Sequence, residues 1–150
     1  MNQRSISERA DYLSRRRARM LPALAVIYFS QQVTFLSALG NGPHRGADHF
    51  KIGAWVVLSL VLMLALATKG FWLQPKEVRD LIDDESTRAN RLDAMRLGFL
   101  FACGAALAAY FIAEFQPLTV GEGAHLVLTF GLGAALIRFG ILERRAHRDA

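Results

Sequence analysis

Four long, nearly uncharged apolar blocks divide this chain of 150 residues, and they constrain its fold more than any other feature. They lie at residues 20–39, 52–69, 97–116 and 120–139. Each has about the 20 residues that a helix needs to cross about 30 Å of hydrocarbon. Because little chain remains between the blocks, there is room for one helical bundle and no separate soluble domain. The sequence therefore predicts an all-α, integral membrane four-helix bundle.

The Lys and Arg residues predict how the four helices are oriented. Of the 18 Lys and Arg residues, all but Arg45 and Lys51 lie in or beside the segments on one side of the apolar blocks. Those segments are a basic tail at 1–19, a charged connector at 70–96 and a tail at 140–150; the opposite segments are the loops 40–51 and 117–119. Cytoplasmic loops carry the excess of Lys and Arg. We therefore expect two in–out–in hairpins in a bacterial inner (plasma) membrane, with both termini cytoplasmic.

The formal net charge of +5 and the pI of about 10.0 also raise the possibility of a nucleic-acid-binding protein. Here the basic residues flank apolar spans, and the lipid bilayer accounts for that placement better than a phosphate backbone does. We expect no nucleic-acid partner.

The connector at residues 70–96 separates the two hairpins and carries the densest charge. Its acidic residues are followed by arginines, and the set considered for partner docking is Asp80, Asp83, Asp84, Glu85, Arg88 and Arg91. Asp84 and Arg88 are four residues apart and can pair on a solvated helix. An exposed, charged helix can also serve as a surface on which a partner protein docks. No Gly or Pro occurs between Asp84 and Gly98, which predicts a third helix that begins in the cytoplasm and enters the membrane unbroken.

The run Asp84-Glu85-Ser86-Thr87-Arg88-Ala89-Asn90-Arg91, with Ala94 and Gly98 beyond it, resembles a stretch in small uncharacterised bacterial four-helix membrane proteins. In those proteins an Asp-Glu pair precedes the second hairpin in a similar way. The resemblance covers this short stretch and implies the same architecture. It implies no activity.

Polar residues inside the first span form a possible interior face. Gln31, Gln32 and Thr34 lie in the second half of that span. Amide side chains in lipid need partners, so this face should turn toward other helices. Two interpretations fit it, namely hydrogen bonding between helices or a path for a substrate.

Ionisable residues near the outer surface form a second candidate site. Glu114 closes the third span, and Glu122 and His125 open the fourth at a Glu-x-x-His spacing that suits metal ligands on a bundle helix. An ionisable residue within a span is also a candidate for proton handling. Alternatively, Glu122 interacts with the dipole of its own helix and Glu114 stays hydrated among the headgroups.

Small residues predict where the helices pack closely. Gly98, Ala102 and Ala106 form one ladder in the third span, and Ala105, Ala109 and Ala113 form another. Such ladders let helix backbones approach each other. We therefore expect the third span to be the central helix of the bundle and the second span, 52–69, to be the most exposed to lipid.

No catalytic motif or cofactor-binding pattern is recognisable, and we expect no cofactor and no bound metal. Three hypotheses remain. The first is a non-enzymatic accessory, assembly or scaffold component that docks a partner protein through the connector. The second is a small homo-oligomeric transporter that uses the polar face of the first span, and the third is a metal-handling or enzymatic site formed by the outer ends of the third and fourth spans.

Overall fold

The structure is a computed structural model that describes Tyr12, Arg16, Met20 and residues 22–32, 46–68 and 85–146, with only the backbone at 46–49. Several predicted segments lie outside the described residues. They are most of the tail at 1–19, the end of the first span at 33–39, the loop at 40–45, the connector at 69–84 and the last four residues.

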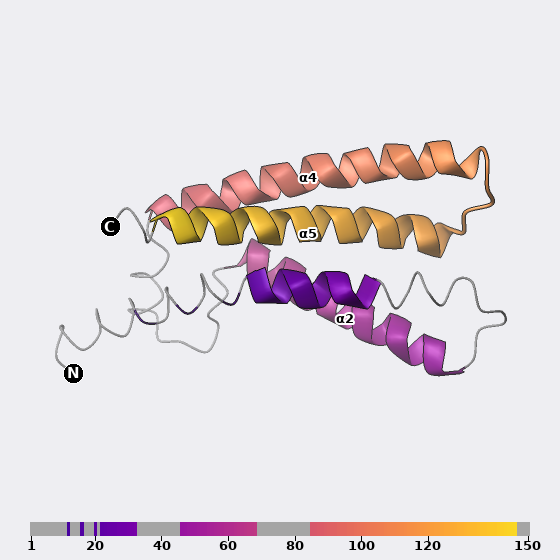
Figure 1. Ribbon diagram of the computed structural model, residues 1–150, viewed down its shortest axis with the longest axis horizontal. Coiled ribbons are helices and arrows are strands. Elements are labelled where there is room, and N and C mark those ends of the chain that lie inside the picture. Colours follow the sequence, from indigo (N-terminus) through magenta and orange to yellow (C-terminus); the bar gives the residue numbers. More distant parts are fainter. Residues whose placement is uncertain are drawn as a thin grey trace.

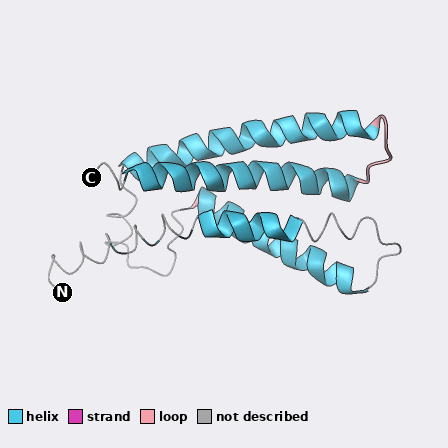
Figure 2. Ribbon diagram, in the orientation of Figure 1, coloured by secondary structure: helices cyan, strands magenta, loops and turns pink. Residues whose placement is uncertain are grey.

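The described chain is helical throughout, with short loops and no strand (Figure 2). Residues 22–32 form a helix, followed by α2 (Gly46–Ala67), α4 (Glu85–Ala113) and α5 (Val120–Ala146). α2, α4 and α5 are each long and apolar enough to cross a membrane. The all-α class is therefore confirmed, together with three helices that could span a bilayer.

The helices run along the long axis of the molecule and are stacked beside one another in layers (Figure 1). α4 and α5 form an antiparallel hairpin, and α5 lies between α4 on one side and α2 with residues 22–32 on the other. In the most apolar stretch of each helix, 44% of the residues are buried in α5, against 17% in α2 and 17% in α4. The prediction that the third span is the central helix is therefore wrong, because the fourth span holds that position.

Small residues bring α4 and α5 into close contact. A Cβ atom added at Gly98 would lie 2.7 Å from the Gly131 carbonyl oxygen and 2.8 Å from Ala135 Cβ. A Cβ atom at Gly131 would lie 2.9 Å from Ala102 Cβ. Gly98 and Ala102, four residues apart on α4, thus face Gly131 and Ala135 on α5. Part of the predicted ladder makes this contact, whereas Ala106 is exposed.

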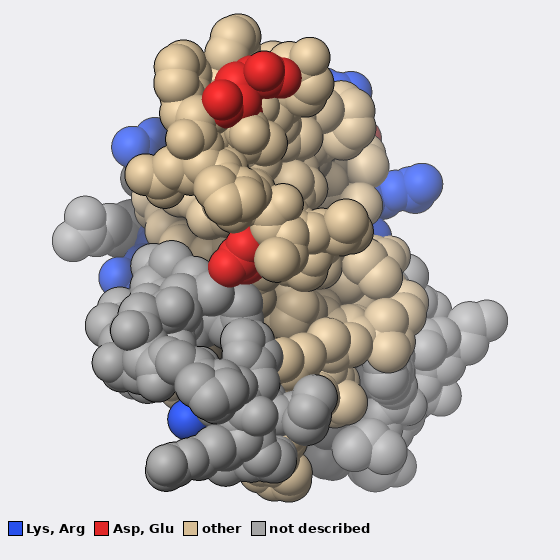
Figure 3. Space-filling view, turned by 90° about the vertical axis from the view of Figure 1, so that its right-hand side faces the viewer, with Lys and Arg blue, Asp and Glu red and all other residues tan. Residues whose placement is uncertain are grey.

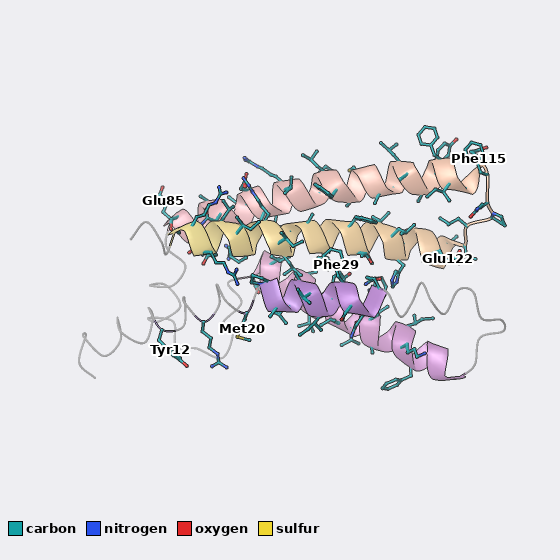
Figure 4. All side chains as sticks on the ribbon, viewed as in Figure 1. Tyr12, Met20, Phe29, Glu85, Phe115 and Glu122 are labelled. Atoms are coloured by element: carbon teal, nitrogen blue, oxygen red, sulfur yellow. The ribbon has the colours of Figure 1, made fainter. Side chains whose placement is uncertain are left out.

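The opposite side of α5 packs on the first helical segment. A Cβ atom at Gly133 would overlap the ring of Phe29, which extends from residues 22–32 toward α5 (Figure 4). Next to this contact lies an apolar core to which all the described helices contribute. Its buried members are Ala25, Tyr28, Leu62, Leu66, Ala94, Ala135, Leu136 and Phe139.

α4 runs without interruption from Glu85 to Ala113, with Glu85 at one end and Phe115 just past the other (Figure 4). Its first half is tied to neighbouring helices by polar contacts. Arg138 Nε donates to Asp93 Oδ2 at 2.8 Å, joining α5 to α4. Arg91 Nη1 donates to the Thr68 carbonyl oxygen at 3.4 Å, next to the end of α2.

The described part of the end that carries the α4–α5 turn has little charge. In Figure 3 the described residues of this face are mostly uncharged, with two small acidic groups and with Lys and Arg toward the edges. The sequence agrees, since no Lys or Arg occurs between Arg96 and Arg138. The basic residues of α4 and α5 therefore gather at the opposite end.

Candidate functional site

Polar side chains from three helices meet inside the bundle. Residues 22–32 contribute one of them, α2 contributes two and α5 contributes two. We call this set the interior polar cluster: Tyr28, Trp55, Ser59, His125 and Thr129. Tyr28, Ser59, His125 and Thr129 are each at most 6% exposed.

Helical spacing explains why these residues meet. Trp55 and Ser59 are four apart on α2, and His125 and Thr129 are four apart on α5. Residues four apart share a helix face about one turn from each other. Each of these two helices therefore presents a ring and, one turn deeper, a hydroxyl group.

The first layer of the interior polar cluster is an aromatic stack. The rings of Trp55 and His125 lie with centroids 4.0 Å apart and an interplanar angle of 30°. Stacking of this kind fixes both rings against each other. The structure places Trp55 half-buried against α5.

The second layer consists of hydroxyl groups. The Tyr28 hydroxyl and Ser59 Oγ lie 3.1 Å apart in hydrogen-bond contact, and Tyr28 is 0% exposed. Thr129 and Trp55 interact with the same Tyr28 hydroxyl. Their Oγ1 and Nε1 atoms are both buried, so side chains from three helices share one buried polar cluster.

Beyond the hydroxyl layer the bundle interior is apolar. Moving away from the α4–α5 turn, the next inward-facing residues are Ala25 on the first segment, Leu62 and Leu66 on α2, and Leu136 and Phe139 on α5. All of them are at most 5% exposed. The interior polar cluster is therefore closed by packed hydrocarbon on the side that carries the basic residues.

The glutamines of the first span lie beside this cluster. Gln32 is 6% exposed and its Nε2 donates to the Tyr28 carbonyl oxygen at 3.4 Å, while Gln31 is half-buried. The predicted inward orientation of the polar face is thus found at Gln32. Ser30, in contrast, is exposed and donates to the Ile27 carbonyl oxygen at 2.8 Å. Thr34 lies outside the described residues.

The outer carboxylates lie at the turn between α4 and α5 and at the start of α5. Glu122 caps its own helix, because Thr119 N and Thr119 Oγ1 donate to Glu122 Oε2 at 2.7 and 2.9 Å, and Glu122 N donates back to Thr119 Oγ1 at 3.3 Å. This is a reciprocal capping box. Glu114 is exposed in the turn after α4. Among the described residues, no group of three His, Cys, Asp or Glu side chains could hold a metal ion.

The connector residues are only partly described. Glu85 and Arg88 are exposed on the first turn of α4, whereas Arg91 is half-buried and reaches the end of α2. Asp80, Asp83 and Asp84 lie outside the described residues. Of the described residues in the predicted docking set, Glu85 and Arg88 therefore present their side chains at the surface.

Sequence reasoning missed Tyr28, Ser59 and Asp93. Tyr28 and Ser59 are 31 residues apart and Asp93 pairs with a residue 45 positions away, so no local pattern connects them. One signal was available, namely a polar residue one turn from an aromatic one on each of two apolar spans: Trp55 with Ser59, and His125 with Thr129.

Comparison of the chain with known proteins finds no match among protein-family models, curated proteins or solved structures. Function must therefore be argued from the residues themselves, since a helical bundle alone implies no activity.

Proposed function

We propose that this protein is a non-enzymatic multi-pass protein of the bacterial inner membrane, an accessory, assembly or scaffold component that binds a partner protein at the cytoplasmic end of α4. The observation that carries the proposal is an exposed stripe on the first half of α4. It consists of Arg88, Leu92, Met95 and Arg96, and we call it the α4 stripe. Leu92 is 51% exposed and Met95 is 42% exposed.

The opposite side of α4 is already occupied, which fixes the direction in which the α4 stripe faces. Ala94 is 0% exposed, and Gly98 lies against Gly131 and Ala135 on α5. The Asp93–Arg138 contact at 2.8 Å adds a polar tie in the same region. Because α4 cannot rotate without breaking these contacts, the stripe stays outward. Apolar side chains presented between charges on a helix face are typical of helix-in-groove recognition.

The charges of the α4 stripe define the kind of partner. Arg88 and Arg96 flank the two apolar side chains on the same helical face. Complementary surfaces place opposite charges across an interface. The partner we propose presents an apolar patch bordered by carboxylates on its cytoplasmic surface.

The proposed topology supports a cytoplasmic position for the α4 stripe. The basic residues of α4 and α5 gather at the end opposite the α4–α5 turn, and positive charge marks cytoplasmic segments. We therefore place the ends of α4 and α5 near Glu85 and Ala146 in the cytoplasm, with two in–out–in hairpins and both chain termini on that side.

The direct experiment is native mass spectrometry after gentle extraction from the native membrane. We expect a second protein to be bound to the wild type and lost in a variant carrying Arg88→Glu and Leu92→Gln. The matched control carries Ile141→Gln and Arg145→Glu, an exposed apolar and basic pair with the same spacing on α5. The control should keep the partner. A wild-type chain that is found without any second protein contradicts the proposal.

Small-molecule transport by a homo-oligomer is a second candidate function, and the burial of Gln32 beside the interior polar cluster favours it. Such a transporter would use the polar face of the first span, and the apolar core would have to open during each cycle. Uptake of a panel of radiolabelled small molecules into proteoliposomes tests the idea. Transport predicts uptake that disappears in Gln31→Leu with Gln32→Leu while the protein still folds; no uptake of any of them by the wild type contradicts it.

A further inference from the structure

We propose that the outward side of α5 is a binding site for an anionic phospholipid of the cytoplasmic leaflet. The site consists of Phe130, Ile137, Arg138, Ile141 and Arg145, and we call it the α5 lipid face. The proposal rests on the membrane orientation given under the proposed function, and it is independent of partner docking at the α4 stripe.

The α5 lipid face is the side of α5 that the bundle leaves open. Gly131 lies against α4, and Gly133 lies against the first helical segment. Between these two contacts, on the remaining side, Phe130, Ile137 and Ile141 are 46%, 43% and 41% exposed. Residues four or seven apart share a helix face, so these three side chains form one continuous apolar stripe.

The apolar stripe has about the length of one leaflet. Eleven residues separate Phe130 from Ile141, which is about 16 Å along a helix. The hydrocarbon core of a bilayer is about 30 Å thick, so one leaflet contributes about 15 Å. No polar residue occurs between Phe130 and Arg138. The stripe therefore lies alongside an acyl chain, with Arg138 and Arg145 at the headgroup end.

The basic end of the α5 lipid face suits a phosphate group. Arg138 Nε donates a hydrogen bond to Asp93 Oδ2 at 2.8 Å, which holds the guanidinium beside α4. The remaining N–H groups of a guanidinium lie on its two Nη atoms, and arginine binds phosphate through such groups. Because Asp93 balances the charge of Arg138, the net positive charge of the site comes from the exposed Arg145, seven residues further along the same side.

This combination of surfaces selects a lipid as the occupant. In the proposed orientation the apolar stripe lies within the hydrocarbon region, and the two arginines lie at its cytoplasmic edge. The cytoplasmic leaflet contains anionic phospholipids, which basic residues at this edge attract. One such molecule supplies both an acyl chain for the stripe and a phosphate for the arginines. A zwitterionic headgroup brings a cation of its own and gains less from them.

Native mass spectrometry of the delipidated full chain tests the proposal. Phosphatidylglycerol and phosphatidylethanolamine with the same acyl chains are added at equal concentrations, so that the two lipids differ only in the headgroup. We expect the wild type to retain phosphatidylglycerol several-fold more than phosphatidylethanolamine. Equal retention of the two lipids, or a second copy of the chain bound in place of lipid, would overturn the proposal.

Two variants with the same change of charge show where the lipid binds. Ile141→Gln with Arg145→Glu alters the α5 lipid face at two exposed positions and should remove the preference for phosphatidylglycerol. Arg88→Glu with Leu92→Gln makes the equivalent change on the α4 stripe and should keep that preference. Loss of the preference in both variants, or in neither, would refute the assignment to α5. Binding of the partner protein should follow the opposite pattern, so the failure of one proposal is distinguishable from the failure of the other.

Discussion

At the scale of single residues, the bundle depends on where backbone approaches backbone. Gly98 and Gly104 lie on the same helix six residues apart, yet their surroundings differ completely. A Cβ atom at Gly98 would meet backbone and Cβ atoms of α5 within 3 Å, whereas a Cβ atom at Gly104 would meet nothing within 4 Å. The sequence predicted a close contact at Gly98 from its spacing with Ala102, but spacing alone does not show which glycines of α4 face a neighbour.

We expect Gly98→Ala to destabilise the bundle by about 1–3 kcal/mol, the usual cost of overpacking a close contact. The atoms in the way belong to the α5 backbone and to Ala135 Cβ, which cannot move aside as the tip of a long side chain can. Unfolding of the purified protein in lipid–detergent mixtures, followed by circular dichroism, measures the change. Gly104→Ala is the same substitution at an open position and should leave stability unchanged; equal effects at both sites would refute the packing described.

We also expect Gly133→Ala to be destabilising, because its Cβ atom would overlap the Phe29 ring. The effect should shrink in a Phe29→Leu background, since the smaller side chain makes room. A double-mutant cycle for two residues in contact should give a coupling energy of about 0.5–3 kcal/mol. Additive effects, with no coupling between the two sites, would show that residues 22–32 do not pack on α5 in this way.

At the scale of elements, α5 is central because it carries small residues on two sides. Gly131 and Gly133 are two residues apart, and so they point about 200° away from each other around the helix. Gly131 meets α4 and Gly133 meets Phe29. Counting small residues favoured the third span instead, because α4 has more alanines. Several of those, such as Ala106 and Ala108, lie on the exposed face of α4.

The start of α5 depends on its capping box, and this assigns Glu122 a structural role. We expect Thr119→Ala to cost about 0.5–2 kcal/mol and to loosen the first turn, because it removes a hydroxyl that both donates to Glu122 Oε2 and accepts from Glu122 N. Hydrogen–deuterium exchange of the amides in the first turn of α5 should rise. Thr68→Ala, at a hydroxyl that donates to the Leu64 carbonyl oxygen near the end of α2, should not change exchange at α5. Unaltered protection of that turn in Thr119→Ala would contradict the capping role.

At the scale of the whole molecule, the apolar blocks predicted the helical class and the three described helices that could span a membrane. They did not predict the interior polar cluster. Tyr28, Ser59 and His125 come from three helices, and a hydropathy pattern carries no information about which faces of different helices meet. The connector was the strongest docking candidate in the sequence. Within that connector, the structure points to Leu92 and Met95 rather than to its acidic residues, and their exposure depends on which side of α4 contacts α5.

The measurement that tests the account most directly is the accessibility of single cysteines from the two sides of the membrane. Cys103 is the sole cysteine, so Cys103→Ala provides a background without thiols. Phe115→Cys then probes the α4–α5 turn, where the side chain is 85% exposed, and Arg145→Cys probes the exposed last turn of α5. A membrane-impermeant maleimide applied to intact spheroplasts should label Phe115→Cys at once and Arg145→Cys only after lysis. Labelling in the reverse order, or labelling of both in intact spheroplasts, would contradict the proposed cytoplasmic position of the α4 stripe.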